Sequence, residues 1–244
     1  MAYVGGKARS SDHIIDILNN PMFDNINYIE PFVGYCHILR RVVNKRSYTA
    51  YDNNDLVIEL FKGVQQDKPY PRISKKKYHE LKIKCQHERV KPSFECAIGA
   101  FTYSYNGKQW GGYAPKSKDG VHNYLKQRLT YYNSLKHNTT FMNTLFSTKD
   151  YRNIKLPNKP ALIYCDPPYR DTTQYGTVFD SDEFWERMRK WSKHHYVIIS
   201  EYKAPSDFIC VSKKKKAITL NNKRDKTTYK YEKVFIYSKG LLSI

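Results

Sequence analysis

The segment Asp166-Pro167-Pro168-Tyr169 combines residue types that could do chemistry on an amino group. It follows the apolar run 161–165, which is typical of a buried strand, and two prolines cannot continue a hydrogen-bonded ladder. The sequence therefore predicts a carboxylate, a rigid carbonyl and an aromatic ring at the carboxyl end of a strand. In open α/β sheets, ligands bind at that end.

This set of groups suits methyl transfer to an amine conjugated with an aromatic ring, such as the exocyclic amine of adenine. Such an amine is a poor nucleophile because its lone pair is delocalised into the ring. The Asp166 carboxylate and the Pro167 carbonyl could accept its two hydrogens and direct the lone pair at a methyl donor. The prolines hold both acceptors in place beforehand, and Tyr169 offers a face for stacking. The alternative is a strand that ends in a turn, but the full tetrapeptide favours the chemical interpretation.

A second pattern indicates a nucleoside cofactor. Gly34 follows a predicted strand over 28–32, and Asp52, 18 positions later, ends a predicted strand over 48–52. An acid near this spacing commonly binds ribose hydroxyls in Rossmann-type folds, although Asp52 at this position could equally cap the next helix. The glycine pattern lacks a pyrophosphate cradle, which suits S-adenosyl-L-methionine. Lys7, in the segment 3–7, could bind the methionine carboxylate.

The charge of the chain indicates a polyanionic partner. Lys and Arg number 42 against 23 Asp and Glu, which gives a net charge of +19 and a pI near 9.6. Nucleic acid is the partner that such a charge favours. Ribosomal-type proteins are equally basic, and a basic surface that only aids solubility is a further alternative.

The cysteines and the apolar segments limit the cellular setting. Five widely spaced cysteines, without zinc-ligand spacing, predict a reduced chain with neither a disulfide framework nor a structural metal. The sequence contains no run of 18 apolar residues, so we expect no membrane span. The amino terminus lacks the apolar stretch of a signal peptide. We therefore expect a soluble intracellular protein.

Hydrophobic periodicity predicts a mixed, mainly parallel sheet flanked by helices, with a β-hairpin at the carboxyl end. The expected strands cover 28–32, 48–52, 140–145, 161–166 and 196–200, and the hairpin covers 208–220 and 229–237. Helices are expected after the first strand, on Ile38 to Val43, then over 55–64 and around Phe184, Met188 and Trp191. The stretch 65–137 interrupts the alternation with helical patterns over 78–85, 94–103 and 121–135. We interpret it as an inserted, mostly helical subdomain.

In this order, the motifs resemble the Dam-like family of DNA adenine methyltransferases, found in bacteria, phages and large DNA viruses. The matching segments are Tyr3 to Lys7, Glu30-Pro31-Phe32-Val33-Gly34, Asp52, Asp150-Tyr151-Arg152, Asp166 to Tyr169 and Ser200-Glu201-Tyr202, with Tyr105-Asn106-Gly107 in the insert. The chain departs from the family at Tyr35 and Cys36, where further glycines are common. The stretch between Phe141 and Asp150 is also longer than usual.

The resemblance implies a Rossmann-like fold of AdoMet-dependent methyltransferases, with a catalytic unit over 1–64 and 138–244 and a DNA-recognition insert over 65–137. It implies base flipping of an adenine in double-stranded DNA and S-adenosyl-L-methionine as methyl donor. The implied catalytic residues are Asp166, Pro167, Pro168 and Tyr169. The implied cofactor residues are Tyr3, Lys7, Glu30, Pro31, Phe32, Gly34, Asp52, Asn53, Asp150, Tyr151 and Asp166. A cognate restriction endonuclease, and a monomer or a homodimer, stay open.

Basic and amide side chains in the insert and the hairpin are the candidate DNA contacts. They are Lys75, Lys76, Lys77, Asn106, Lys108, Gln109, Trp110, Lys116, Arg170, Lys214 and Arg224. Lysine runs are usually solvated, so we expect only about half of these residues to touch phosphate. Base reading is expected from the loop that carries Lys108, Gln109 and Trp110.

Two alternatives to adenine methylation remain on sequence grounds. Methylation of the cytosine amine or of RNA would use similar chemistry. A non-catalytic basic protein that binds nucleic acid and only keeps the fold belongs to a different class. The intact acids Asp166 and Asp52 favour the enzyme.

Overall fold

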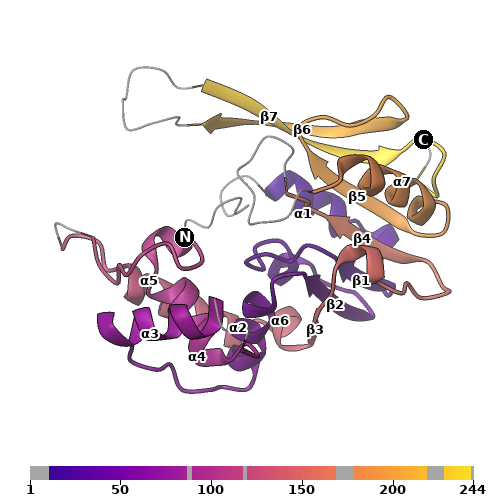
Figure 1. The fold of residues 1–244 in the computed structure, drawn as a ribbon. Helices are drawn as coiled ribbons and strands as arrows, with labels where there is room; N and C mark the ends of the chain where they lie inside the picture. The colour runs from indigo at the N-terminus through magenta and orange to yellow at the C-terminus, as the bar shows by residue number, and fades with distance from the viewer. Residues whose placement is uncertain (1–10, 87–89, 118–119, 169–178, 219–227, 243–244) are drawn as a thin grey trace.

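A seven-stranded sheet forms the centre of the computed structural model, which describes residues 11–86, 90–117, 120–168, 179–218 and 228–242. The strand order is β3-β2-β1-β4-β5-β7-β6 (Figure 1). The strands are β1 (Asn27–Glu30), β2 (Ser47–Asp52), β3 (Thr144–Thr148), β4 (Ala161–Cys165), β5 (Tyr196–Glu201), β6 (Phe208–Ile218) and β7 (Thr228–Tyr237). The side chains of residues 216–218 and 228–230 are outside the description.

The first five strands are parallel, and the last two form an antiparallel hairpin. β1 lies between β2 and β4, and the pairs β2–β3 and β4–β5 are also parallel. β7 pairs antiparallel with both β5 and β6. Every residue of β4 is buried, as expected for a central parallel strand covered on both faces. The predicted fold class, a mixed and mainly parallel sheet with a carboxyl-terminal hairpin, is confirmed.

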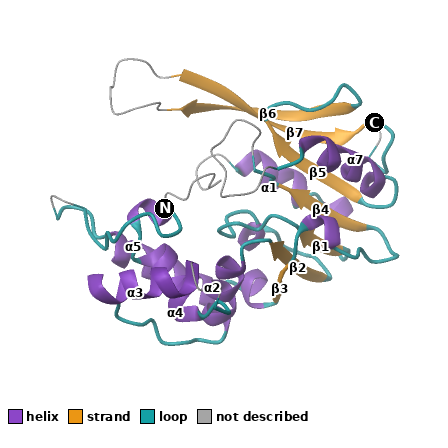
Figure 2. Cartoon of the chain, viewed as in Figure 1, coloured by secondary structure: helices purple, strands orange, loops and turns teal. Residues whose placement is uncertain are grey.

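Helices cover both faces of the sheet (Figure 2). They are α1 (Asp12–Leu18), α2 (Asp55–Gln65), α3 (Lys75–Gln86), α4 (Phe94–Ala97), α5 (Tyr124–Lys136), α6 (Thr139–Met142) and α7 (Ser181–Ser192). Alternate residues of β4 enter two separate hydrophobic clusters. Leu162 packs in the cluster that contains α1 and α2, and Ile163 packs in the cluster that contains α7.

The helices α3, α4 and α5 lie in the chain between α2 and β3, in the stretch predicted as the insert. α4 and α5 pack against α2 (Figure 1), and their buried side chains share one cluster with α1 and with β1. A Cβ on Gly63 of α2 would lie 2.0 Å from the Phe94 ring, so only glycine permits this approach. The helical stretch therefore has no separate core.

The structure corrects two elements. The helix expected on Ile38 to Val43 is only a short 3-10 turn, Leu39–Arg41. Val42, inside the expected helix, is extended (φ −80°, ψ 129°), and Asn44 just after it is left-handed (φ 58°), so the right-handed turn ends at Arg41. The strand expected over 140–145 begins later, at Thr144, because Asn138 caps the short helix α6 before it.

The expectation that every cysteine is reduced is wrong for one pair. Cys85 at the end of α3 and Cys96 in α4 form a disulfide, whereas Cys36, Cys165 and Cys210 are free. The two bonded cysteines are 11 positions apart, and only the packing of α3 against α4 brings them together. Within the described residues, no helix has both the length and the apolar character to cross a membrane.

Candidate active site

The candidate site lies at the carboxyl ends of three neighbouring strands. Asp52 ends β2, Glu30 ends β1 and Asp166 directly follows β4, and these strands are adjacent in the order β2-β1-β4. Parallel strands place their carboxyl ends at the same edge. The structure thereby brings together three acids that are up to 136 positions apart in the chain. From the sequence, Asp52 was predicted to bind the cofactor ribose and Asp166 to hold the reacting amine.

Backbone donors fix the orientation of the Asp52 carboxylate. Its Oδ2 accepts from the N–H of Gly34 at 3.0 Å, and its Oδ1 accepts from the N–H of Asn54 at 2.9 Å. Burial raises the pKa of Asp52 to about 6, against the opposing effect of these donors and of the Asn53 N–H. The two carboxylate oxygens offer more lone pairs than these backbone donors use, so the carboxylate keeps acceptor capacity for a hydroxyl group of a ligand. The carboxylate does not cap α2, because the Asn54 side chain does.

Glu30 is 2% exposed and accepts a hydrogen bond from the Tyr28 hydroxyl at 2.7 Å. Burial raises the pKa of Glu30 well above its usual range; the Tyr28 bond opposes this, and the nearby Asp166 and Asp52 carboxylates raise the pKa further. Glu30 therefore keeps its proton over a wider pH range than an exposed glutamate. A neutral Glu30 limits the negative charge at this edge and favours ionisation of its two neighbours.

Aromatic rings form a wall beside these acids. The Phe32 ring, predicted in the cofactor loop, lies 5.2 Å from Tyr151, 6.2 Å from Phe179 and 6.0 Å from Phe184 between ring centroids. Tyr151 is buried, and burial raises its pKa to about 12, so its hydroxyl is neutral. Rings of this kind provide a flat apolar surface for a purine.

Asp150, predicted beside the cofactor, is held by Arg152. The guanidinium donates to both carboxylate oxygens at 2.8 Å, and the hydrogen bond from Arg152 lowers the pKa of Asp150. The pair also fixes the short 3-10 turn that begins at Tyr151. Asp150 is therefore ionised, and Arg152 fixes its orientation next to Tyr151.

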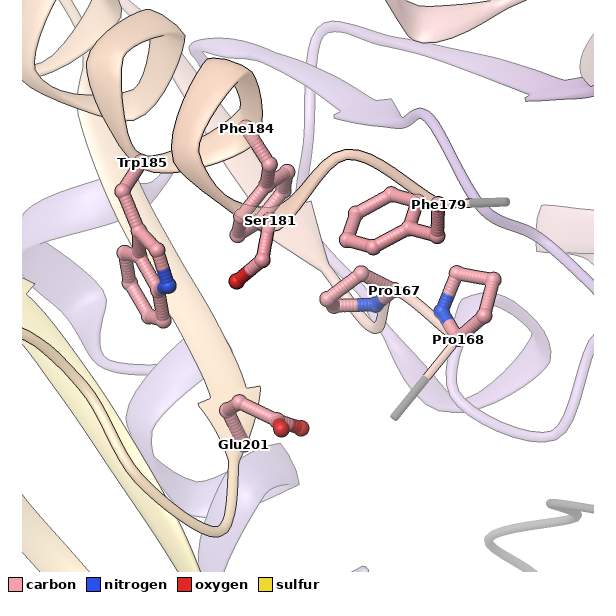
Figure 3. A pocket seen from close by; sticks show the side chains of 7 residues that line it. All are labelled: Pro167, Pro168, Phe179, Ser181, Phe184, Trp185 and Glu201. Carbon is pink, nitrogen blue, oxygen red and sulfur yellow. The ribbon is translucent and has the colours of Figure 1, made fainter. Parts of the chain in front are cut away.

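A small pocket lies against the Asp-Pro-Pro segment. Pro167 is buried and Pro168 is exposed, and both line the pocket with side chains from β5 and from the region of α7 (Figure 3). The other lining residues are Phe179, Ser181, Phe184, Trp185 and Glu201. Figure 3 shows the Glu201 carboxylate at the end of β5, facing the two prolines and the Phe179 ring across the pocket. The lining is mostly apolar, with Ser181 and Glu201 as its polar residues.

The two polar residues of this pocket, Ser181 and Glu201, were assigned no role from the sequence. Glu201 is 8% exposed and ends β5, so the rule that identified Asp52 and Asp166 applies to it as well. Ser181 begins α7, and no local sequence signal distinguishes it from an ordinary helix start. Only the fold places it opposite Glu201.

The predicted DNA contacts fall into two groups. Lys75, Lys76, Asn106, Lys108 and Lys116 are exposed. The others make protein contacts: Lys77 lies 3.7 Å from Glu95, Lys214 lies 3.8 Å from Asp12, and Gln109 accepts a hydrogen bond from Asn54.

Trp110 is a correction. It is 5% exposed, its ring centroid lies 5.4 Å from that of Tyr78, and its backbone N–H donates to the Ala100 carbonyl. The ring belongs to the core beneath the loop because α3 and the 98–102 turn enclose it. A base could not stack on it without opening that core, so we withdraw Trp110 from the DNA contacts.

Five predicted residues lie outside the described part of the chain. They are Tyr3, Lys7, Tyr169, Arg170 and Arg224.

No protein-family model matches the sequence, and no curated protein matches it either. Solved structures with a similar backbone include the rRNA methyltransferase aviRa from Streptomyces viridochromogenes, with a TM-score of 0.40 and 11% identity over 98% of this chain and 89% of the other. The 23S rRNA methyltransferase ErmE has a TM-score of 0.38 and 11% identity over 97% and 72%. Likeness at this level carries no argument about function, and the fold rests on the strand order and register of this chain.

Proposed function

We propose that this protein is an S-adenosyl-L-methionine-dependent methyltransferase that acts on the exocyclic amine of adenine in duplex DNA. The observation that carries the proposal is the meeting of Asp52, Glu30 and Asp166 at one edge of the sheet, with the two prolines directly after Asp166. Asp52 keeps acceptor capacity for a ribose, and the two prolines after Asp166 line a small, mostly apolar pocket.

The residues present fit the cofactor. Asp52 would accept from the ribose, because its carboxylate is oriented by backbone N–H groups and has more lone pairs than those donors use. Phe32 and Tyr151 would pack on the adenine ring of the cofactor, and Asp150 would accept from its amine. When bound, S-adenosyl-L-methionine supplies a methyl group on a sulfonium, and transfer to the base amine leaves S-adenosylhomocysteine and a proton.

The chain's own contribution is to hold the base amine. The Asp166 carboxylate and the Pro167 carbonyl accept its two hydrogens, and the fixed φ of the prolines keeps the acceptors in place. As the amine becomes positively charged, the Asp166 carboxylate stabilises it and can receive its proton. The raised pKa of Glu30 favours its neutral form, which limits the negative charge beside Asp166.

The charge of the chain supports a nucleic-acid substrate, and we propose duplex DNA. The net charge is +19, and Lys75, Lys76, Lys108 and Lys116 present exposed cations on the helical stretch. Flipping an adenine out of the duplex costs a few kcal/mol. Phosphate contacts from such lysines can offset that cost.

The test is methyl transfer from tritiated S-adenosyl-L-methionine to duplex DNA, with structured RNA in parallel because the amine chemistry is the same. Digestion to nucleosides identifies the product. Label in N6-methyl-2′-deoxyadenosine supports the proposal, and label in another base or in RNA alone redirects the substrate. Absence of label with every polymer, in a protein that also fails to bind S-adenosylhomocysteine, contradicts the enzyme and favours a binding protein.

A further inference from the structure

Two separate contacts connect the helical stretch to the two segments that would hold the cofactor. The first involves α5 and the loop 33–37 after β1. The Tyr131 hydroxyl donates to the Tyr35 carbonyl at 2.6 Å, and the Tyr35 and Tyr132 hydroxyls are 2.9 Å apart. The rings of Tyr35 and Tyr131 are nearly parallel, with centroids 6.3 Å apart.

This contact holds the loop 33–37, which is neither helix nor strand. Gly34 and Cys36 are left-handed, so no helix continues from β1. Tyr35 is 3% exposed, and its hydroxyl belongs to a buried network in which Tyr132 also accepts from Thr102 at 3.2 Å. The position where the sequence departs from a glycine-rich loop is therefore an anchor to α5.

The second contact involves the loop 105–113 and the acid at the end of β2. Asn54 donates its amide to Gln109 Oε1 at 2.7 Å. The backbone N–H of the same Asn54 donates to Asp52, whose other oxygen accepts from Gly34. A continuous hydrogen-bonded chain thus runs from Gln109 through Asn54 and Asp52 to Gly34.

We propose that Tyr131 and Gln109 are positioning residues for the cofactor, and that nucleic acid bound to the loop 105–113 tightens cofactor binding through them. The proposal rests on the proposed function. The same loop exposes Asn106 and Lys108 to solvent, so a ligand there contacts the segment that carries Gln109. Because binding free energies are reciprocal, the cofactor in turn strengthens nucleic-acid binding by the same factor.

Tyr131→Phe and Gln109→Ala each remove one of these contacts. Tyr131→Phe deletes one hydroxyl and keeps the ring, and Gln109→Ala removes a half-buried amide. The matched controls are Tyr124→Phe and Gln127→Ala, both in α5; Gln127 is exposed and lies outside the loop 105–113. Thermal melting of all four variants confirms that each is folded.

Calorimetric titration with S-adenosylhomocysteine measures the effect. We expect about three- to tenfold weaker binding for Tyr131→Phe and Gln109→Ala, the loss expected for one hydrogen bond, and wild-type affinity for the controls. With S-adenosyl-L-methionine as substrate, KM rises by a similar factor while kcat is unchanged. A duplex DNA tightens S-adenosylhomocysteine binding by wild type, and the factor falls toward one in Gln109→Ala.

The outcomes separate this inference from the function beneath it. If wild type binds S-adenosylhomocysteine and both variants bind it equally well, the positioning role is wrong and the cofactor site stands. If the DNA effect is the same in wild type and Gln109→Ala, the coupling through the loop is wrong. If wild type does not bind S-adenosylhomocysteine at all, the proposed function fails first and this inference with it.

Discussion

Replacing Asp52 with asparagine should separate cofactor binding from stability. The substitution keeps the size of the side chain and removes its charge. One carboxylate oxygen becomes an NH₂ group, which must face the N–H of either Gly34 or Asn54, so one of these donors loses its acceptor. The ribose hydroxyls lose a charged acceptor at the same time.

The two effects have different magnitudes. A hydrogen bond to a charged group contributes about 1.5 to 3 kcal/mol, and we expect the ribose contacts to lose about 3 kcal/mol together, which is about 100-fold in Kd. For folding, a pKa of about 6 in place of 3.8 means that burying the ionised carboxylate costs about 3 kcal/mol at neutral pH. Relief of that cost offsets the roughly 1 to 3 kcal/mol for an unsatisfied N–H.

Calorimetric titration with S-adenosylhomocysteine and chemical denaturation of the same samples provide the assay. We expect about 100-fold weaker binding by Asp52→Asn and a free energy of unfolding within about 2 kcal/mol of wild type. Binding within about threefold of wild type by a folded Asp52→Asn protein would refute the role of Asp52 in holding the ribose.

Three further predictions follow from the same structure. The pKa of Asp52 is raised to about 6, so its contribution to stability is complete below about pH 4 and is lost as pH rises through about 6. S-adenosylhomocysteine binding needs the ionised carboxylate and therefore weakens below about pH 6. A binding affinity that does not change with pH would contradict this prediction. Gly63→Ala places a Cβ 2.0 Å from the Phe94 ring and should lower the free energy of unfolding by about 1 to 3 kcal/mol, whereas unchanged denaturation would show that α2 and α4 do not pack as described. Breaking the Cys85–Cys96 bond by Cys85→Ser should lower the free energy of unfolding by about 2 to 3 kcal/mol under non-reducing conditions; equal stability of wild type with and without reductant would mean that the bond does not contribute.

The sheet was predictable because its strands carry strong apolar patterns and end at recognisable residues. Asp52 and Asp166 end or follow such strands, so their meeting at one edge follows from parallel pairing. The short turn after β1 was not predictable in the same way. The apolar pattern at Ile38 to Val43 suits a helix, but Val42 is extended and Asn44 is left-handed, so the chain leaves the helical conformation after one short turn.

Residues that act through tertiary contacts gave little local signal. Trp110 stands among loop residues with polar neighbours, and its burial depends on α3. Gln109 looked like a base reader, and the structure joins it to Asn54. The Cys85–Cys96 bond depends on a helix crossing that spacing alone cannot indicate.

The most direct test of the central claim is methyl transfer by Asp166→Ala, with Asp16→Ala in the exposed part of α1 as the matched control. Loss of a preorganised electrostatic contact to the reacting group costs about 10²- to 10³-fold in rate. We predict that loss for Asp166→Ala on duplex DNA, with S-adenosylhomocysteine binding retained, and wild-type rates for the control. Equal incorporation of label by wild type and Asp166→Ala would contradict the account.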